Sequence, residues 1–362
     1  MHRDHRPADI HRKVVELAER GHFFAVALVL KAEGSTPRKA GVKAVIDENG
    51  RIWGTVGGGQ VEAECQRRAV EACKSKRPVV FDIHLEGAAT TDETPICGGT
   101  MRILIDPRAA RNRAAYAEAA EALQKRERGV LLTVMRTAAE TEVAAQWFPE
   151  NAIPSDAAFP GTDAIRECLA SEMPQLFVED TGESAARLEV FVEPVIPKPL
   201  LLIVGGGHIG QALALQATLI GFDVTVIDDR PEFSNTVLFP DGVTTRCGDI
   251  PKEVAGFPVN KETYIVIVTR GHKHDAEALK ACIHRPAAYI GMIGSKRKVA
   301  LLRRDFIETG LATEEEFNRV FAPIGLDIGA VTVPEIATSI AAQLIAVRRK
   351  GACHELAFTR RP

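Results

Sequence analysis

The chain has 362 residues, more than one hydrophobic core usually organises, so two domains are expected. It is 46% hydrophobic and 26% charged with a net charge of −3, which excludes a basic field for nucleic acid or an acidic membrane surface. The seven cysteines are scattered and contain no Cys-x-x-Cys pair, as is typical of a reducing compartment. No apolar run approaches the ~20 residues of a membrane span, and the N-terminus lacks the apolar core of a signal peptide. We therefore expect a cytoplasmic protein with no membrane span and no nucleic-acid partner.

The first half of the chain mixes helical and strand patterns, which predicts an α+β domain over residues 1–195. Residues 138–186 carry no clear pattern, and Pro194, Pro197 and Pro199 predict a short stiff linker. In chain order the patterns predict a helix (8–20), three strands (23–30, 42–46, 51–56), a helix after 57–59, two strands (78–85, 101–106), a helix (109–128) and two strands (130–135, 187–193).

Two glycine-rich loops and one cysteine of this domain are candidates for binding. Gly57, Gly58 and Gly59 lie between a strand and a helix, where bare backbone amides favour an anion or polar ligand; alternatively, they only allow a close helix–sheet crossing. Arg38, on the loop 34–41, is suited to an anionic partner, although a solvated charge fits as well. Cys97 precedes two glycines, a setting that favours the thiolate that ligates soft metals or carries sulfur; the alternative is a small buried side chain.

The second half has the pattern of a nucleotide-binding domain. An apolar run (200–204) leads into Gly205-x-Gly207-x-x-Gly210 and a helical pattern, with His208 inside the turn. The glycines permit the turn, the approach of a pyrophosphate and close helix–strand packing. Asp228 ends the next strand about where a ribose-binding acid is expected, ~20 residues on, and would favour NAD over NADP. We predict a Rossmann-like doubly wound parallel sheet over residues 196–362, with a ligand-free glycine turn as the alternative.

Further strands are predicted at 243–247, 264–269 and 288–292, each followed by a loop on the ligand-binding edge of such a sheet. The loop 270–275 contains His272, which we expect to hydrogen-bond a ligand rather than bind a metal. The loop 291–298 contains Ser295 and Lys296 at a helix start, which suits a phosphate or carboxylate; a solvated helix start is the alternative. A final helix is predicted at 334–347.

Several ordered blocks of the chain together resemble the XdhC/CoxI family of molybdenum-hydroxylase maturation factors. In the first half they are Glu33-Gly-Ser-Thr-Pro-Arg38, Gly54-Thr-Val-Gly-Gly-Gly59 with Glu62, and Cys97-Gly-Gly99. In the second half they are Ile203-Val-Gly-Gly-Gly-His-Ile-Gly210, Val226-Ile-Asp-Asp-Arg230, Thr269-Arg-Gly-His272 with Asp275, Tyr289-Ile-Gly-Met-Ile-Gly-Ser-Lys-Arg-Lys298, Pro323-Ile-Gly-Leu-Asp-Ile-Gly329 and Pro334-Glu-Ile-Ala337.

The resemblance implies a chaperone that binds and protects the molybdenum cofactor (molybdopterin). It also implies help with sulfuration and insertion of the cofactor into xanthine dehydrogenase or a related hydroxylase. A cysteine desulfurase and a second copy of the chain are then expected partners. Some relatives have a cysteine after the triple glycine where this chain has Gln60, which leaves Cys97 as the candidate metal ligand. The remaining six cysteines (Cys65, Cys73, Cys168, Cys247, Cys282 and Cys353) are expected to pack in the core or to be incidental.

Two other functions remain open on the sequence. The fingerprint also fits an NAD-dependent oxidoreductase, although no acid/base pair accompanies it beyond His208, His272 and His274. It equally fits a regulatory module that senses NAD and binds a partner. Whether the chain turns over a substrate is therefore left open.

Overall fold

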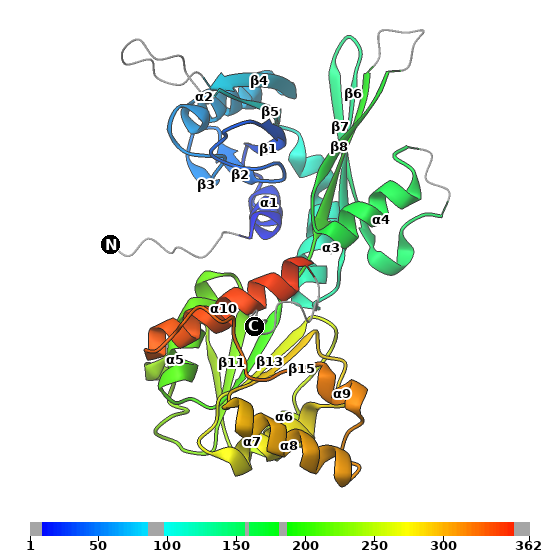
Figure 1. The fold of residues 1–362 in the computed structure, drawn as a ribbon. Helices are drawn as coiled ribbons and strands as arrows, with labels where there is room; N and C mark the ends of the chain where they lie inside the picture. The colour runs from blue at the N-terminus through cyan, green and yellow to red at the C-terminus, as the bar shows by residue number, and fades with distance from the viewer. Residues whose placement is uncertain (1–8, 86–97, 156–158, 181–186, 351–362) are drawn as a thin grey trace, which may run out of the picture. The chain divides into compact units, whose positions relative to one another are not determined.

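The computed structural model describes residues 9–85, 98–155, 159–180 and 187–350. The chain divides into two compact units, Met1–Pro197 and Lys198–Pro362. The N-terminal unit contains two sheets and the C-terminal unit contains one (Figure 1).

The N-terminal unit begins with a five-stranded antiparallel sheet. Its order is β3 (Ile52–Gly54), β2 (Lys43–Asp47), β1 (Phe24–Glu33), β5 (Gly99–Asp106) and β4 (Val79–Leu85). The first seven residues of β1 are all buried, because a helix covers one face of the sheet, and two helices together with a second sheet cover the other. The helix α2 (Gly59–Ser75) packs on one face, and α1 (Ile10–Glu19) and α3 (Arg113–Gln124) pack on the other. The helix predicted over 109–128 is shorter in the structure, where α3 begins at Arg113, directly after the 3-10 turn η1 (Ala109–Asn112).

A second antiparallel sheet completes the unit. Its order is β7 (Thr141–Pro149), β6 (Gly129–Thr137), β9 (Arg187–Val195) and β8 (Gln175–Asp180), with α4 (Thr162–Ser171) on one face. A core of Leu28, Leu30, Leu104, Met135 and Phe191 joins the two sheets. The stretch 138–186, which has no clear sequence pattern, therefore holds β7, the 3-10 turn η2 (Glu150–Ala152), α4 and β8.

The prediction that Pro194 lies in the linker is wrong. It pairs with Val130 in the β6–β9 ladder. The pairing of β9 with β8 ends at Val192, so the missing proline N–H interrupts no bond on that side.

The C-terminal unit is a six-stranded, all-parallel sheet. Its order is β12 (Thr244–Cys247), β11 (Asp223–Asp228), β10 (Leu200–Val204), β13 (Thr263–Ile267), β14 (Tyr289–Met292) and β15 (Val320–Phe321). The chain builds outward from β10 in one direction and then, from β13, in the other, which is the order of a doubly wound Rossmann sheet. The predicted fold class is confirmed. The strand β15 has only two residues and was not predicted.

Helices cover both faces of this sheet, as Figure 1 shows. On one face lie α5 (His208–Leu219) and α10 (Val333–Lys350). On the other lie α6 (Ile250–Ala255), α7 (His272–Cys282), α8 (Lys296–Glu308) and α9 (Glu314–Asn318). The 3-10 turn η3 (Thr236–Leu238) follows β11. Over the described ranges, none of the helices has the length and apolar character needed to cross a bilayer.

Candidate ligand-binding sites

The glycine turn after β10 has two kinds of glycine. A Cβ on Gly205 would collide with the Val268 carbonyl, and one on Gly210 would collide with the Gly205 carbonyl. Gly207 differs, because it has an ordinary φ of −66° and a Cβ on it would meet nothing within 4 Å. Gly205 and Gly210 are therefore required by packing, whereas Gly207 keeps an open surface in front of α5. The amides of the first turn of α5 have no carbonyl of their own helix to bind, as at any helix start.

Asp228, at the end of β11, ties this turn to the sheet. Its Oδ2 accepts hydrogen bonds from Gly206 N–H at 2.8 Å and from Arg230 Nη2 at 2.9 Å. Its Oδ1 accepts from Arg230 Nε at 2.9 Å and from Arg230 backbone N–H at 3.0 Å. Burial raises the pKa of Asp228, but the bonds from Arg230 and Gly206 outweigh it, so the pKa is lowered overall. The carboxylate side chain is only 2% exposed.

Gly206, one of the unspecified positions of the fingerprint, is constrained as well. Its N–H donates to Asp228, and a Cβ on it would collide with the Phe233 carbonyl. The glycine spacing alone does not identify this requirement, because the collision comes from a segment 27 residues further along the chain.

The structure brings the two predicted loops after β13 and β14 together. A pocket of about 230 Å³ lies between them, at the starts of α7 and α8, and Lys298 is among its lining residues. Within it Thr269 Oγ1 donates to Asp275 at 2.6 Å. The pocket is lined by Thr269, Gly271, Asp275, Met292, Ile293, Gly294, Lys298 and Val299.

The predicted side chains around this edge have different settings. His208 is exposed as the first residue of α5, and His272 is the first residue of α7. Ser295 caps α8, its hydroxyl accepting from Lys298 N–H at 3.4 Å, and Lys296 follows it, exposed. Capping gives Ser295 a structural role whether or not a ligand binds.

In the N-terminal unit the triple glycine begins α2. A Cβ on Gly57 would lie 2.8 Å from Pro37 and 3.7 Å from the Arg38 side chain, so the loop 34–41 lies against this turn. Gly58 and Gly59 both have positive φ, 70° and 54°, and a Cβ on either would meet nothing within 4 Å. The exposed Arg38 thus lies beside the start of α2, where Gly58 and Gly59 leave the backbone open.

Hydrogen bonds between polar groups stabilise the 57–59 turn. Thr55 Oγ1 donates to Glu62 Oε2 at 2.7 Å and accepts from Gly57 N–H at 3.2 Å. Glu62 is therefore positioned by the turn that it follows.

A third segment reaches the same end of the five-stranded sheet. A Cβ on Gly34 would lie 2.7 Å from the Gly98 carbonyl, and one on Gly99 would collide with the Ser35 carbonyl. The loop 33–38 is thus flanked by the 57–59 turn and by the start of β5. Cys97 lies outside the described residues, so its predicted role stays a prediction.

Most described cysteines are packed in cores. Burial raises the pKa of Cys65 and Cys282 to about 12 and that of Cys73 and Cys168 to about 11. Cys247 is exposed instead, and Cys353 lies outside the described residues. Within the described ranges no group of three His, Cys, Asp or Glu side chains is arranged to hold a metal ion.

A largely buried cluster of ionisable side chains in the N-terminal unit was not predicted from sequence. Lys43 on β2 hydrogen-bonds the carboxylate of Glu193 on β9, and His11 Nε2 lies 3.9 Å from the same carboxylate. Burial, with the nearby charge of Lys43, lowers the pKa of His11 to about 3. Its three members come from segments far apart in sequence, so no local pattern marks the cluster.

The pKa of His11 makes stability depend on pH. Between about pH 6.5 and about pH 3 the unfolded chain binds a proton at His11 that the folded chain does not. The free energy of unfolding therefore falls as the pH falls through this window. Asp106, whose pKa burial raises to about 6, has the opposite effect between about pH 3.8 and 6, because its folded form holds the extra proton.

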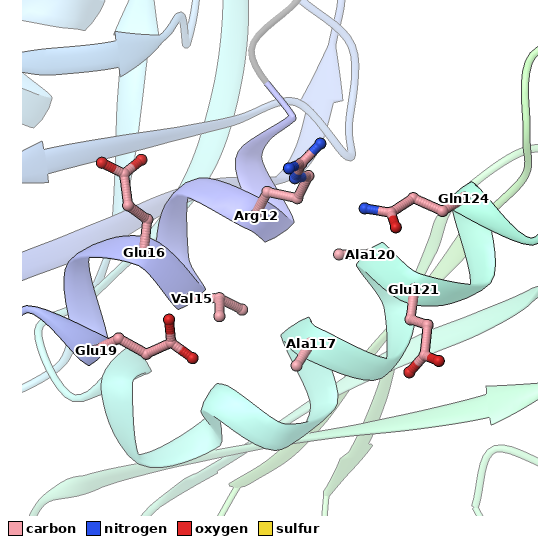
Figure 2. A pocket seen from close by; sticks show the side chains of 8 residues that line it. All are labelled: Arg12, Val15, Glu16, Glu19, Ala117, Ala120, Glu121 and Gln124. Carbon is pink, nitrogen blue, oxygen red and sulfur yellow. The ribbon is translucent and has the colours of Figure 1, made fainter.

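A groove of about 460 Å³ between α1 and α3 is less suited to an anionic cofactor (Figure 2). Its carboxylates are each paired with a cation: Glu16 with Lys13 and Arg20, Glu19 with Arg113, and Glu121 with Lys125. Figure 2 shows these carboxylates along both helices, with small alanines between them. The groove is acidic and largely neutralised by its neighbours.

The all-parallel sheet and glycine turn define the C-terminal unit as a Rossmann-type domain, joined to an α+β unit with its own glycine-rich turn. Family models identify both halves. The XdhC Rossmann domain matches residues 201–344, and the XdhC and CoxI family model matches residues 17–84. The chain belongs to the XdhC/CoxI family.

Similar proteins span most of the chain at low identity. The uncharacterized protein YqeB of Escherichia coli is 26% identical over 94% of this chain. This chain spans only about half (46%) of the length of YqeB. A Bacillus subtilis protein described as a probable xanthine dehydrogenase subunit is 24% identical over 94% of this chain and 98% of its own length. The molybdenum cofactor insertion chaperone PaoD of E. coli is 23% identical over 95% of this chain and 89% of its own length.

A solved structure shares the fold. A crystal structure described as a xanthine dehydrogenase from Bacillus halodurans matches with a TM-score of 0.67 at 23% identity, covering 93% of this chain and 96% of the other. At this identity the match supports the fold alone.

Proposed function

We propose that this chain binds the molybdenum cofactor, protects it, and assists its sulfuration and its insertion into a xanthine dehydrogenase-type hydroxylase. The observation that carries the proposal is the family match of both halves, at 17–84 and 201–344. A relative aligned over 95% of this chain is described as a molybdenum cofactor insertion chaperone, which supports the same role.

The C-terminal turn has the features that a phosphate group of the cofactor requires. Gly207 leaves open space where a phosphate would approach, and the first amides of α5 carry the partial positive charge of a helix start. His208 is exposed beside this surface. In our proposal Gly205 and Gly210 shape the turn, and the phosphate binds between Gly207 and His208.

In our proposal the loops at the same edge of the sheet contact a further part of the ligand. Their pocket of about 230 Å³ lies between two helix starts. We propose that His272 and Lys296, at the starts of α7 and α8, hydrogen-bond the cofactor, with Ser295 fixing the α8 start.

The N-terminal unit supplies a second surface for a polar or anionic group. Gly58 and Gly59 leave the start of α2 open, and Arg38 lies next to Gly57. We propose that this surface binds an anionic part of the cofactor and that Cys97, two residues before Gly99, ligates its molybdenum or carries sulfur as a thiolate. When bound, the cofactor supplies the soft metal centre; the chain supplies amides, a guanidinium and a thiol.

The proposed partners follow from the role. The acceptor is a molybdenum hydroxylase of the xanthine dehydrogenase type, the sulfur donor is a cysteine desulfurase, and the chaperone acts in the cytoplasm as a homodimer. A cytoplasmic site agrees with the free cysteines of the described residues.

An NAD-dependent oxidoreductase, or an NAD-sensing module, is the second candidate, favoured by the strand order of the Rossmann sheet. The engagement of Asp228 by Arg230 weakens it, because the carboxylate that would bind the ribose is already bonded. Absorbance changes of the nicotinamide with candidate substrates would support the enzyme. Calorimetric titration with NAD, with and without the hydroxylase, would support the sensor.

Isolation of the full chain under anaerobic conditions tests the proposal. We expect molybdenum and oxidised-pterin fluorescence to co-purify with it in near-stoichiometric amounts, and Arg38→Ala with Gly207→Ala to lower both. Folded full-length protein that retains neither molybdenum nor pterin would contradict the proposal.

A further inference from the structure

The Asp228–Arg230 pair determines what the glycine turn can recognise in a ligand. In sheets of this order an acid at the end of the second strand ordinarily binds the ribose hydroxyls of a dinucleotide. Here both carboxylate oxygens of Asp228 are occupied: Arg230 donates to each of them, and Gly206 N–H donates to Oδ2. With its side chain 2% exposed, Asp228 has no accessible face for a ribose.

Arg230 is itself held in place. Its guanidinium carbon lies 3.8 Å from the centroid of the Phe233 ring, and its Nε is 3.8 Å from the neighbouring carboxylate of Asp229. Phe233 N–H and Ser234 N–H in turn donate to the Arg230 carbonyl, at 3.0 and 3.1 Å. The short turn after β11 thus fixes both the backbone and the guanidinium of Arg230.

A ribose hydroxyl competes poorly for a carboxylate bonded in this way. A bidentate guanidinium–carboxylate pair consists of charge-assisted bonds, which are stronger than those that a neutral hydroxyl donates. Displacing Arg230 would also leave Asp228 as a buried, unpaired charge during the exchange. Asp228 therefore acts on the ligand only indirectly, by positioning Gly206 and so the turn.

We propose that the glycine-turn site recognises its ligand as a phosphate ester or pyrophosphate and does not read the 2′-hydroxyl of an attached sugar. This inference rests on the proposed function, in which the turn binds a phosphate of the cofactor. Arg230 is the specificity-determining residue, because it occupies the carboxylate that would otherwise select a ribose. Ligands in which the phosphate is attached to a pterin side chain, a deoxyribose or a ribose are then equivalent at this position.

The test uses three probes on the full-length protein: inorganic pyrophosphate, ADP, and 2′-deoxy-ADP, measured by isothermal titration calorimetry. ADP and 2′-deoxy-ADP differ only in the hydroxyl in question. For the native chain we expect pyrophosphate to bind and the two nucleotides to bind within about twofold of each other. In Arg230→Ala the freed carboxylate should favour ADP over 2′-deoxy-ADP by about tenfold or more, the value of a hydrogen bond to a charged group.

Two variants make the result specific. Arg270→Ala is the matched control, because it removes a neighbouring cation that pairs with Asp229 at 3.5 Å and leaves the Asp228–Arg230 pair intact. Its ratio of ADP to 2′-deoxy-ADP affinity should stay near one. Asp228→Asn should also keep that ratio near one, which provides a second reading if Arg230→Ala does not fold.

The outcomes separate the inference from the function on which it rests. A native chain that prefers ADP by about tenfold, with the preference lost in Asp228→Asn, overturns the inference and leaves the phosphate site standing. Failure of all three probes to bind overturns both the inference and the phosphate site. If folded Arg230→Ala binds ADP and 2′-deoxy-ADP with equal affinity, the role of Arg230 is overturned.

Discussion

Gly207 and Gly210 lie three residues apart at the start of α5, but substitution of each should have a different effect. We predict that Gly207→Ala leaves the fold intact and weakens phosphate binding, whereas Gly210→Ala destabilises the fold. The reason lies in their surroundings: a Cβ on Gly207 meets nothing within 4 Å, but one on Gly210 collides with a backbone carbonyl.

The expected magnitudes follow from those surroundings. Alanine is a poorer helix N-cap than glycine, which lowers the free energy of unfolding of Gly207→Ala by a few tenths of a kcal/mol or more. The less flexible unfolded chain raises it by about 0.4–1 kcal/mol, so the two effects nearly cancel. Its methyl group would displace a phosphate from at least one amide, which costs about 1.5–3 kcal/mol, or roughly tenfold to 150-fold in affinity. Gly210→Ala forces a backbone shift that costs about 1–3 kcal/mol.

Two assays separate these effects. Thermal unfolding should show the Gly207→Ala midpoint within a few degrees of the native one and a fall of about 2–4 °C per kcal/mol for Gly210→Ala. Calorimetric titration with pyrophosphate should show the loss of affinity in Gly207→Ala. If Gly207→Ala binds pyrophosphate as tightly as the native chain, the open surface at Gly207 is not a phosphate site and the reasoning fails.

Three further predictions concern the N-terminal unit. Cys97→Ser should fold normally but lose molybdenum on anaerobic isolation, whereas Cys247→Ser, at an exposed position, should retain it; equal metal content in the two would refute a role for Cys97. His11→Gln should remove the His11 part of the pH dependence, so that on going from pH 7 to pH 5 the free energy of unfolding in urea falls less, or rises more, than in the native chain, by at most about 1.4 kcal/mol per pH unit. An unchanged difference would show that folding does not lower the pKa of His11. Lys43→Met should lower the free energy of unfolding by about 3–5 kcal/mol, because it removes the cation that the largely buried Glu193 carboxylate hydrogen-bonds. Adding Glu193→Leu should recover most of the loss, and a small effect of the single substitution would contradict a stabilising Lys43–Glu193 pair.

Much of the fold is predictable because local patterns encode it. The apolar run 200–204, the glycine turn and the acid-ended strand 223–228 correctly predict the central strands of a parallel sheet, since such strands are buried on both faces. The helix after 57–59 and the strand after 100 follow from periodicity in the same way. Where the pattern is weak, as in 138–186, the elements form through tertiary packing: β8 is held by its ladder with β9.

The settings of the site residues depend on contacts that sequence does not show. The fingerprint identifies Asp228 as an acid at the right place, but its bidentate bonds to Arg230 are visible only in three dimensions. The same holds for Gly206, whose constraint comes from the Phe233 carbonyl. The convergence of the loops at Gly34, Gly57 and Gly99 also depends on the antiparallel ladder of β1 and β5, which joins segments some 70 residues apart.

A transfer assay tests most directly our proposal that this chain carries the molybdenum cofactor to an acceptor enzyme. Anaerobically isolated full-length protein is mixed with cofactor-free xanthine dehydrogenase-type hydroxylase, and hydroxylase activity is followed over time. We predict that the hydroxylase activity rises in proportion to the cofactor carried by the chain, and faster than with the same amount of free cofactor. Activation no faster than with free cofactor, by a chain shown to be folded, would contradict it.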